Sequence, residues 1–323
     1  MKKIAVFTSG GDAPGMNAAI RAVVRSGIYN KAEVFGILLG FEGMMDGNFI
    51  PLSAEGVSNI IQRGGTIIKT TRSPRFRTKE GMLLACNQIQ KHEIDGVIAI
   101  GGDGTFRAAE DFHQYCSIPF IGIPCTIDND LTGTDYTIGY DTAINTVVEA
   151  VDKIRDTADS HNRLFFVEVM GHDSGQIALM SSIGVGAEAV LIPESITDME
   201  HLLYILDKGW NRKKSSCIII VAEGGESGGA YKVAEKVKSH FDQYDTRVTV
   251  LGHIQRGGSP TCADRVCATR LGVAAVEALL AGRKQEMVGI INNQIVYTPF
   301  NNAVKQHQPI DPGLLKLTAI LSS

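Results

Sequence analysis

Short apolar runs recur along the chain, and each is followed by glycine or a polar turn and then by residues with helical spacing. The runs are IAVFTSGGD from Ile4, EVFGILLG from Glu33, GVIAIGGDG from Gly96, PFIGIPCTIDND from Pro119, LFFVEVMGHDSG from Leu164, AVLIPE from Ala189, CIIIVAEGG from Cys217 and RVTVLGHIQRGGS from Arg247. Their strand portions are apolar throughout instead of alternating, which is typical of parallel strands covered by helices on both faces. The pattern predicts an α/β fold with mostly parallel sheets flanked by helices.

The length of the chain favours more than one compact unit. At 323 residues it exceeds what a single hydrophobic core usually serves, so we expect two lobes or one domain with a substantial second layer. Two pairs of short sequences are alike: TSGGD at 8–12 with AIGGD at 99–103, and QRGGT at 62–66 with QRGGS at 255–259. They share no fixed period, so they indicate similar backbone turns used twice, with two related lobes as the alternative.

Composition excludes several classes of protein. The net charge is −4, which argues against a nucleic-acid or anionic membrane surface, because both need an excess of clustered Lys and Arg. The start MKKIAVFTSGGD has an apolar run too short for a signal peptide, and no window approaches the roughly 20 apolar residues of a membrane span. We therefore expect a cytoplasmic protein. The cysteines form no C-x-x-C pair, which favours reduced core thiols over a zinc site.

Two glycine-rich turns follow predicted strands. SGGDAPGMNAAIRAVVR, from Ser9, predicts a strand end, a glycine turn and a helix from about Pro14. Glycines let backbone N–H groups approach an anion and a helix N-terminus adds a positive dipole end, so a phosphate site is favoured over a mere tight turn. IGGDGTFRAA, from Ile100, repeats the arrangement with Asp103 between glycines, where a carboxylate can hold Mg²⁺ against phosphate oxygens. Neither turn has the Lys-Ser/Thr ending of a Walker A loop.

Cations and carboxylates gather near other turns. The basic stretch RGGTIIKTTRSPRFR at 63–77 is either a local anion site or a solvated loop. Arg163 and Arg247 each lie near a predicted strand. GHIQRGGS at 252–259 contains a histidine and an arginine in a turn-rich setting, which favours an oxyanion or phosphate site. The aspartates at 128, 130, 135 and 141 leave three alternatives: a catalytic base, a metal cage, or a set of turn caps.

Taken together, these motifs resemble one enzyme family. The sequences TSGGDAPGMNAAIR, GGDGT, PCTIDND, GTDYTIGYDTA, VEVMG and LGHIQRGGSP are similar to those of the bacterial-type ATP-dependent 6-phosphofructokinases (phosphofructokinase family A), from about residue 1 to 300. The resemblance implies two Rossmann-like lobes, with 1–138 plus 252–300 binding the nucleotide and 139–251 plus 301–323 binding the sugar phosphate. It also implies a homotetramer that uses Mg²⁺ to transfer the γ-phosphoryl group of ATP to the 1-hydroxyl of fructose 6-phosphate in glycolysis.

The resemblance assigns roles residue by residue. Asp128 would be the base that receives the hydroxyl proton, beside Thr126 and Asp130, and Asp103 would organise Mg²⁺. The positions implied to line the nucleotide are Gly11, Arg72, Ser73, Gly102, Asp103, Gly104 and Thr105. The positions implied to contact the sugar are Thr126, Asp128, Met170, Gly171, His172 and Glu223. Those implied to hold its 6-phosphate are Arg163, Arg247, His253 and Arg256, the first two from a neighbouring subunit. Asp135 and Asp141 are left as caps of turns and of a helix that begins near Asp141.

Two positions bear on the phosphoryl donor. Relatives that use pyrophosphate carry Asp where this chain has Gly104 and Lys where it has Cys125. Gly104 leaves room for ATP, and a neutral thiol at Cys125, which departs from the glycine usual in ATP users, cannot replace the lysine. ATP is therefore the expected donor. Two further departures are His172 in place of an arginine near the transferred phosphoryl group, which can make catalysis pH-dependent, and Ser73 in place of an aromatic residue beside Arg72.

An effector site for ADP or phosphoenolpyruvate is implied as well. The matching positions are Arg21, Arg25, Arg155, Gly186, Glu188, Arg212 and Lys214, while Ala54, Ser215 and Ser216 depart from the pattern. The alternatives to an ATP-dependent enzyme are the pyrophosphate-dependent version, another GGDG kinase acting on NAD or a lipid, and a non-catalytic sugar-phosphate sensor. Intact Asp103, Asp128 and Asp130 argue against the sensor, because a sensor would be free to lose them.

Overall fold

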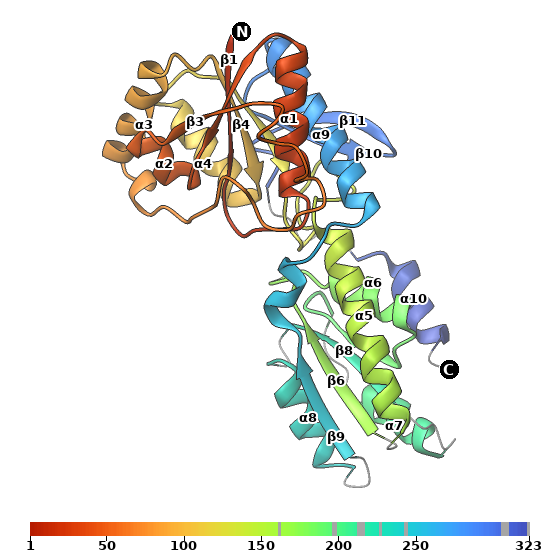
Figure 1. Ribbon diagram of the computed structural model, residues 1–323. Helices are drawn as coiled ribbons and strands as arrows, with labels where there is room; N and C mark the ends of the chain where they lie inside the picture. Colours follow the sequence, from red (N-terminus) through yellow and green to blue (C-terminus); the bar gives the residue numbers. More distant parts are fainter. Residues whose placement is uncertain are drawn as a thin grey trace. The chain divides into compact units, whose positions relative to one another are not determined.

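A computed structural model describes the chain in two units, each compact in its own contacts (Figure 1). The described residues are 1–160, 163–195, 199–211, 217–225, 228–241, 245–304 and 310–321. The first unit consists of Met1–Thr126, Leu131–Thr142 and Arg256–Gln306, and the second of Ile127–Asp130, Ala143–Gln255 and His307–Ser323. The lobes predicted from the sequence were 1–138 plus 252–300 and 139–251 plus 301–323, and the ligand that each unit binds stays a prediction.

The strands of the first unit form one sheet in the order β11-β10-β5-β4-β1-β2-β3. They are β1 (Lys3–Thr8), β2 (Glu33–Ile37), β3 (Phe49–Leu52), β4 (Gly96–Gly101), β5 (Phe120–Pro124), β10 (Glu286–Ile291) and β11 (Gln294–Pro299). β3 and β11 are antiparallel to their neighbours and the other pairs are parallel. The central strands β1 and β4 are buried along almost their whole length, as their continuous apolar sequences predicted.

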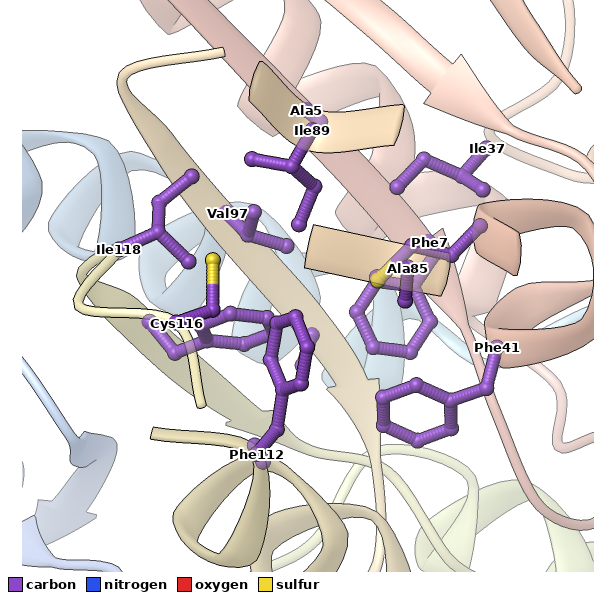
Figure 2. Close-up of a cluster of buried hydrophobic side chains, with 14 of the residues drawn as sticks. Ala5, Phe7, Ile37, Phe41, Ala85, Ile89, Val97, Phe112, Cys116 and Ile118 are labelled. Atoms are coloured by element: carbon purple, nitrogen blue, oxygen red, sulfur yellow. The ribbon is translucent and has the colours of Figure 1, made fainter. Parts of the chain in front are cut away.

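Helices cover both faces of this sheet. They are α1 (Met16–Tyr29), α2 (Gly40–Asp46), the 3-10 turn η1 (Arg75–Arg77), α3 (Lys79–Lys91), α4 (Asp103–His113) and α9 (Cys262–Leu280). In Figure 1 α1 and α9 run side by side, and the lack of a side chain at Gly272 lets α9 approach Ala22 of α1. On the other face, Phe41 of α2, Ala85 of α3 and Phe112 of α4 pack with Phe7 of β1 in the cluster of buried side chains shown in Figure 2.

The second unit is built on a parallel sheet in the order β7-β8-β6-β9. Its strands are β6 (Arg163–Val169), β7 (Ala189–Leu191), β8 (Cys217–Ala222) and β9 (Asp245–Val250). Its helices are α6 (Gln176–Val185), α7 (Met199–Asn211), α8 (Ala230–Lys238), the 3-10 turn η2 (Gly252–Arg256) and α10 (Pro312–Leu321), and α5 (Tyr140–Asp159) begins in the first unit and continues here. Apolar side chains of β6 and β8 pack with those of α7 and α8. The α/β fold predicted from the sequence is confirmed.

The described residues also form β3, β10 and β11, which the sequence pattern did not predict. β10 and β11 form an antiparallel hairpin whose turn consists of Asn292 and Asn293, both with positive φ angles of 49° and 63°. Asparagine tolerates this left-handed conformation better than most residues, and two such residues in succession match the type I′ turns of tight hairpins. The Asn-Asn pair between the VGII and QIVY runs was therefore an available signal for this hairpin.

Candidate active site

The first unit has its topological switch point between β1 and β4. The chain leaves β1 toward β2 on one side and returns to β4 on the other side, which is where ligands bind in open parallel sheets. Thr8 lies beside Ile100, and Gly101 lies beside Pro124, so the strand ends of β1, β4 and β5 are level. The backbone N–H of Ser9 donates to Ile100 O at 3.0 Å, and that of Cys125 donates to Gly101 O at 2.9 Å. Three loops from distant parts of the sequence therefore meet at one edge.

The loop after β4 presents a helix N-terminus at this edge. α4 begins at Asp103, with Gly102 as its N-cap residue and no side-chain hydrogen bond to the cap. A Cβ atom added at Gly104 would meet nothing within 4 Å, so the space beside the first turn of α4 is open. Because a helix N-terminus carries a partial positive charge and glycine leaves its backbone accessible, the arrangement is suited to phosphate oxygens. Thr105 is buried and packs close to Gly101 instead of facing solvent.

Asp103 is the acidic side chain of this helix start, and its Oδ1 accepts a hydrogen bond from Arg107 Nε at 2.8 Å. Both side chains are partly exposed. Within the described ranges, no group of three or more His, Cys, Asp or Glu side chains is placed to hold a metal ion. A magnesium ion that is carried largely by substrate phosphates needs only one or two protein carboxylates. A single aspartate at a phosphate cradle therefore fits Mg²⁺, and Arg107 is a neighbouring cation that the sequence reasoning missed.

Arg256 lies against the first glycine loop. A Cβ atom added at Gly11 would lie 2.6 Å from Arg256 Nη1, and the same nitrogen donates to Asp12 O at 3.4 Å. The guanidinium group therefore covers the turn after β1, where the sequence predicts nucleotide phosphates. Arg72 is exposed in the 62–72 segment. Ser73 uses its hydroxyl to donate to Glu42 at 2.7 Å and to accept from Phe76 N at 3.0 Å, so it holds the start of η1.

The basic stretch 63–77 contains one cation that is already paired within the fold. Arg75 forms ion pairs with Glu42 at 2.8 Å and with Asp46 at 2.6 Å, both on α2. The hydrogen bond to Asp46 is also the largest of the effects that raise the pKa of Arg75. This arginine fastens the segment to α2, so the two interpretations left by the sequence, an anion site or a solvated loop, concern the remaining cations of the stretch.

The aspartate-rich segment after β5 divides between the two units. Thr126 belongs to the first unit, and its carbonyl accepts a hydrogen bond from Thr137 Oγ1 at 2.6 Å. Asp128 is half-buried and Asp130 is buried, both in the part assigned to the second unit. Asp135 accepts from the backbone N–H of Asn292 at 2.8 Å, in the turn of the β10–β11 hairpin. Its carboxylate therefore holds a turn, as the sequence predicted.

Asp141 and Asp264 join the first turns of α5 and α9. Asp141, in the first turn of α5, accepts a hydrogen bond from Thr261 Oγ1 at 2.5 Å. Asp264 of α9 is 3% exposed and accepts from the backbone N–H groups of Gly139 and Thr142, each at 2.8 Å. Burial raises the pKa of Asp264, while these hydrogen bonds and that of the Thr142 hydroxyl lower it in part. A carboxylate from a distant helix thus caps α5, which nothing in the local sequence indicated.

The second unit has its own switch point between β6 and β9. Met170 follows β6, and its backbone N–H donates to Gln255 Oε1 at 3.2 Å, while Gln255 Nε2 donates to Gly252 O at 3.0 Å. Gln255 is fully buried, so this one amide joins the ends of both strands. Glu223 follows β8 and accepts from the backbone N–H of His172 at 3.0 Å. Met170, Gly171, His172 and Glu223 are therefore brought together by the structure, with Gln255 as a support that the sequence reasoning missed.

His172 adopts an unusual backbone conformation at this edge. Its φ angle is 54°, in the left-handed region that residues other than glycine rarely occupy, and it follows Gly171 with a φ of 141°. The imidazole Nδ1 lies 2.8 Å from Asp173 Oδ2, and both side chains are largely exposed. His253, in η2, is also exposed. His172, which the resemblance places where an arginine is usual, therefore has the carboxylate of Asp173 as a neighbour.

Arg163 and Arg247 lie at the opposite edge of the same sheet. Arg163 begins β6 and pairs in register with Asp245, the first residue of β9. Arg163 Nε is 2.7 Å from Asp245 Oδ2, and Arg247 Nη2 is 2.9 Å from Asp245 Oδ1. β6 rises by about 3.3 Å per residue, so its two ends are roughly 20 Å apart. Arg163 is therefore too far along the strands from Met170 and Glu223 to share a phosphate with them within one chain.

The residues implied for an effector are only partly described. Arg155 of α5 donates through Nη2 to the carbonyl of Val185, and its distance to the carbonyl of Gly186 is 3.5 Å. Glu188 is buried and accepts from the backbone N–H of Ile218 at 2.6 Å. Arg21 and Arg25 lie on α1 in the first unit. Arg212, Lys214, Ser215 and Ser216 lie outside the described residues.

One unit has a glycine-flanked helix start suited to phosphates at its switch point, and the other has a loop braced by carboxylate and amide groups. Such an arrangement is typical of α/β phosphotransferases. Comparison with known families makes this assignment specific: residues 3–279 match the family model described as Phosphofructokinase. A curated ATP-dependent 6-phosphofructokinase of Cytophaga hutchinsonii is 56% identical over 322 residues, covering 100% of this chain and 98% of that protein. ATP-dependent 6-phosphofructokinase 1 of Thermus thermophilus is 52% identical over 322 residues and is covered completely, as is this chain.

The chain belongs to the phosphofructokinase family. Among solved structures it is similar to phosphofructokinase from Saccharomyces cerevisiae, with a TM-score of 0.90, 36% identity and coverage of 100% of this chain and 48% of the yeast chain. The chain thus spans about half the length of that larger relative. A pyrophosphate-dependent phosphofructokinase from Marinobacter aquaeolei has the same fold, with a TM-score of 0.84, 22% identity and coverage of 100% of this chain and 92% of that one.

Proposed function

We propose that this protein transfers the γ-phosphoryl group of ATP to the 1-hydroxyl of D-fructose 6-phosphate, giving fructose 1,6-bisphosphate and ADP. The proposal is supported by full-length relatives named ATP-dependent 6-phosphofructokinase at 50% identity and more. It is also supported by the glycine-lined helix start at the switch point of the first unit, because that arrangement suits the phosphates of a nucleotide. This cradle is the single structural observation on which the proposal depends most.

Asp128 is the proposed base for the hydroxyl proton, with Thr126 and Asp130 beside it in the sequence. Phosphoryl transfer proceeds through a loose transition state that needs neutralised charge and in-line positioning more than a strong base. An aspartate can therefore serve without an unusual pKa. His172 is the proposed substitute for the family's arginine near the transferred group, and its imidazole lies beside the carboxylate of Asp173.

Asp103 is the proposed protein ligand of Mg²⁺. The ion supplies charge neutralisation on the phosphates when it is bound. The chain contributes the carboxylate at the start of α4, and Gly102 and Gly104 leave the first turn open. Arg107 holds Asp103 from the next helical turn through its bond to Oδ1, which orients the carboxylate before any ligand arrives.

Two positions support ATP over pyrophosphate as the donor. The open space at Gly104 accommodates the α-phosphate that pyrophosphate lacks. Cys125 is 2% exposed, and burial raises the pKa of its thiol, so this position carries no positive charge with which to bind a smaller donor. The pyrophosphate-dependent alternative and the sensor remain the competing functions that an assay must exclude.

The sugar phosphate site is proposed to use a second copy of the chain. Arg163 and Arg247 are held by Asp245 at the edge of the second-unit sheet that lies away from Met170 and Glu223. If all of these residues act on one substrate, the arginines come from a neighbouring subunit, as in a homotetramer. His253 and Arg256 then complete the cationic surroundings of the 6-phosphate from the same chain as Glu223.

Regulation by ADP or phosphoenolpyruvate is proposed for the site that includes Arg155, Gly186 and Glu188. In the described part of this site, the Arg155 guanidinium is bonded to the end of α6, so an anionic effector would have to compete with a backbone carbonyl. None of the helices in the described ranges combines the length and apolar composition that a bilayer crossing requires. A cytoplasmic location stays part of the proposal.

The experiment that tests the proposal follows the product. Purified protein is incubated with ATP, fructose 6-phosphate and Mg²⁺, and the product is examined by ³¹P NMR. We expect a new phosphate ester on the 1-hydroxyl, formed only with Mg²⁺ present. Binding of fructose 6-phosphate without any turnover would favour the sensor. Titration of the same assay with ADP and with phosphoenolpyruvate then tests the effector site separately.

A further inference from the structure

The two similar sequences QRGGT and QRGGS lie against one another in the first unit. A Cβ atom added at Gly64 would overlap the carbonyl oxygen of Gly258, so the two backbones approach as closely as glycine allows. Ser259 donates from its hydroxyl to Gln62 O at 2.8 Å. The two similar sequences therefore form two loops, one at 62–66 and one at 256–259, that contact one another.

Asn17 holds the 62–66 loop through hydrogen bonds to its backbone. It lies in the first turn of α1 and is 1% exposed. Its Nδ2 donates to Arg63 O and to Gly64 O, both at 3.1 Å, and its Oδ1 accepts from Ile67 N at 2.8 Å. A side-chain amide has two donor hydrogens and an acceptor oxygen; here the donors bond to the 62–66 loop and the acceptor bonds to Ile67, the residue that follows it.

The segment that continues from this loop, as far as residue 70, is hydrogen-bonded to the end of β1 and to the turn that follows it. Thr8 donates from Oγ1 to Lys69 O at 2.9 Å, and Thr70 donates from Oγ1 to Gly10 O at 2.9 Å. Arg72 is only two residues beyond Thr70, which limits the distance of its Cα from that of Thr70 to about 7 Å. The position of Arg72, proposed to bind the nucleotide, therefore depends on the same bonded segment that Asn17 holds.

The second loop carries the other cation. Arg256 precedes Gly258 by two residues, and its guanidinium lies beside Gly11 and Asp12. Arg256 is proposed to bind the 6-phosphate of the sugar, while Gly11 is proposed to bind the nucleotide. Any shift of the 62–66 loop is transmitted to the 256–259 loop through Gly64, Gly258 and the Ser259 hydrogen bond, because closely packed backbones cannot move past one another without a clash.

We infer that Asn17 and Ser259 are positioning residues that hold the 62–66 and 256–259 loops in a fixed position relative to one another. Arg72 and Arg256, the cations proposed to bind the two substrates, are thereby positioned together. The inference rests on the proposed function, since it assigns one substrate to each cation. Neither residue touches a substrate in this account, and each acts on the placement of Arg72 and Arg256. The consequence is that loosening the pair weakens the binding of ATP and of fructose 6-phosphate in parallel.

The variants Asn17→Asp and Ser259→Ala test this inference. Asn17→Asp keeps the shape of the side chain but replaces two donors with an oxygen that faces the carbonyls of Arg63 and Gly64. Ser259→Ala removes the bond to Gln62 and releases Arg265, whose Nη2 donates to the same hydroxyl at 2.8 Å. Matched controls are Asn30→Asp, at the other end of α1, where the amide donates to Ser26 O, and Ser58→Ala, where an exposed hydroxyl donates to Glu55 O.

The measurement is kcat and KM for each substrate, with unfolding midpoints recorded for every variant. We expect Ser259→Ala to raise both KM values by roughly fivefold, the worth of one net hydrogen bond, and Asn17→Asp to raise both by more than about tenfold, with kcat changed far less. The controls should leave both KM values unchanged. A purely structural role would lower the unfolding midpoint and the active fraction without moving KM.

Two outcomes would overturn the inference: unchanged KM values in both variants, or a rise for only one substrate. If Asn17→Asp does not fold, Ser259→Ala on the protein surface still decides between these outcomes. Wild-type protein is assayed first, so absence of turnover there would count against the proposed function itself, whereas an active wild type with unaffected variants would count against the coupled loops alone.

Discussion

The switch points of the two units are built from different chemical groups. In the first unit, three strand ends and the start of α4 form an edge whose useful property is the absence of side chains at Gly11, Gly102 and Gly104. In the second unit, the corresponding edge is braced by buried or bonded polar side chains, with Gln255 joining two strands and Glu223 holding His172. The first edge suits phosphates bound through backbone and helix dipole, and the second offers polar side chains for the sugar that is proposed to bind there.

This comparison predicts that different substitutions damage the two edges. Adding even a methyl group should damage the first edge, because ligand and backbone must come close. Removing a polar group should damage the second edge, because a buried partner is then left without its hydrogen bond. Proton transfer is assigned to neither edge but to the short segment that contains Asp128, and the largest effect is expected there.

Replacing Asp128 with asparagine should abolish most of the turnover while leaving substrate binding in place. General-base catalysis typically contributes a factor of about 10² to 10⁴, so we expect kcat to fall within that range. ATP affinity, measured by titration calorimetry, should change little because the side chain acts on the sugar hydroxyl. A decrease of less than about tenfold would mean that the base has been assigned to the wrong residue.

Mixing two inactive variants tests whether the second edge is completed by another copy. Arg163→Ala and Glu223→Ala should each lose most activity at moderate fructose 6-phosphate concentration. If Arg163 serves the site of a neighbouring subunit, hybrids formed by unfolding and refolding the two variants together should recover a clear part of the wild-type rate. Each variant refolded alone is the control. Hybrids no more active than their parents would contradict a site that is completed by Arg163 of a neighbouring subunit.

The substitution Gly11→Ala tests the first edge. The added Cβ would lie 2.6 Å from Arg256 Nη1, so the guanidinium group has to move away from the turn. We expect KM for both substrates to rise by roughly tenfold, the equivalent of about 1.4 kcal/mol. Gly56→Ala is the matched control, since its nearest heavy atom would be 3.6 Å away in an ordinary contact. Kinetics indistinguishable from wild type would show that Arg256 does not need its place beside Gly11.

The smallest effect concerns the carboxylate that caps α5. Burial raises the pKa of Asp264 above its ordinary value of 3.8, so the folded protein binds this proton more tightly than the unfolded chain does. The corresponding contribution to stability is full below about pH 4 and is lost as the pH rises through the folded pKa. The difference in unfolding free energy between wild type and Asp264→Asn, measured in urea from pH 4 to 7, should therefore become less favourable to wild type as the pH rises.

Asp95 provides a control with the opposite sign. Backbone N–H groups of Lys2 and Lys3 lower the pKa of Asp95, so its contribution is present above the unfolded pKa and is lost as the pH falls through the folded pKa. The difference in unfolding free energy between wild type and Asp95→Asn should therefore become more favourable to wild type as the pH rises. A difference for Asp264→Asn that is independent of pH, or that grows in favour of wild type with rising pH, would contradict the assignment of a raised pKa.

The sequence was a good guide to elements and a poor guide to contacts across the chain. Continuous apolar runs correctly predicted the buried parallel strands β1, β4, β5, β6 and β8, since burial on both faces leaves that signature, whereas the parallel strand β10 was missed. β3 was missed because FIPL is short and contains proline. Proline is compatible with an edge strand but does not by itself predict one. The bond from Asp264 to the start of α5 joins residues more than a hundred positions apart, and no local pattern encodes such a pairing.

The sequence allowed the kind of site to be proposed, but not the arrangement of its residues. Glycine turns after strands indicated phosphate chemistry, because that requirement is local to the backbone. The place of Arg256 against Gly11 depends on how the 256–259 and 62–66 loops pack, which is a property of the whole first unit. Likewise, the separation of Arg163 from Glu223 follows from strand direction and register, so only the assembled sheet reveals that one chain cannot bring them together.

A comparison of donors is the most direct test of the central claim that this is an ATP-dependent enzyme. Initial rates are measured with fructose 6-phosphate and Mg²⁺ at matched concentrations of ATP and of pyrophosphate. The open space at Gly104 and the buried, uncharged thiol of Cys125 predict rapid turnover with ATP and none above background with pyrophosphate. Turnover with pyrophosphate and not with ATP would contradict the account.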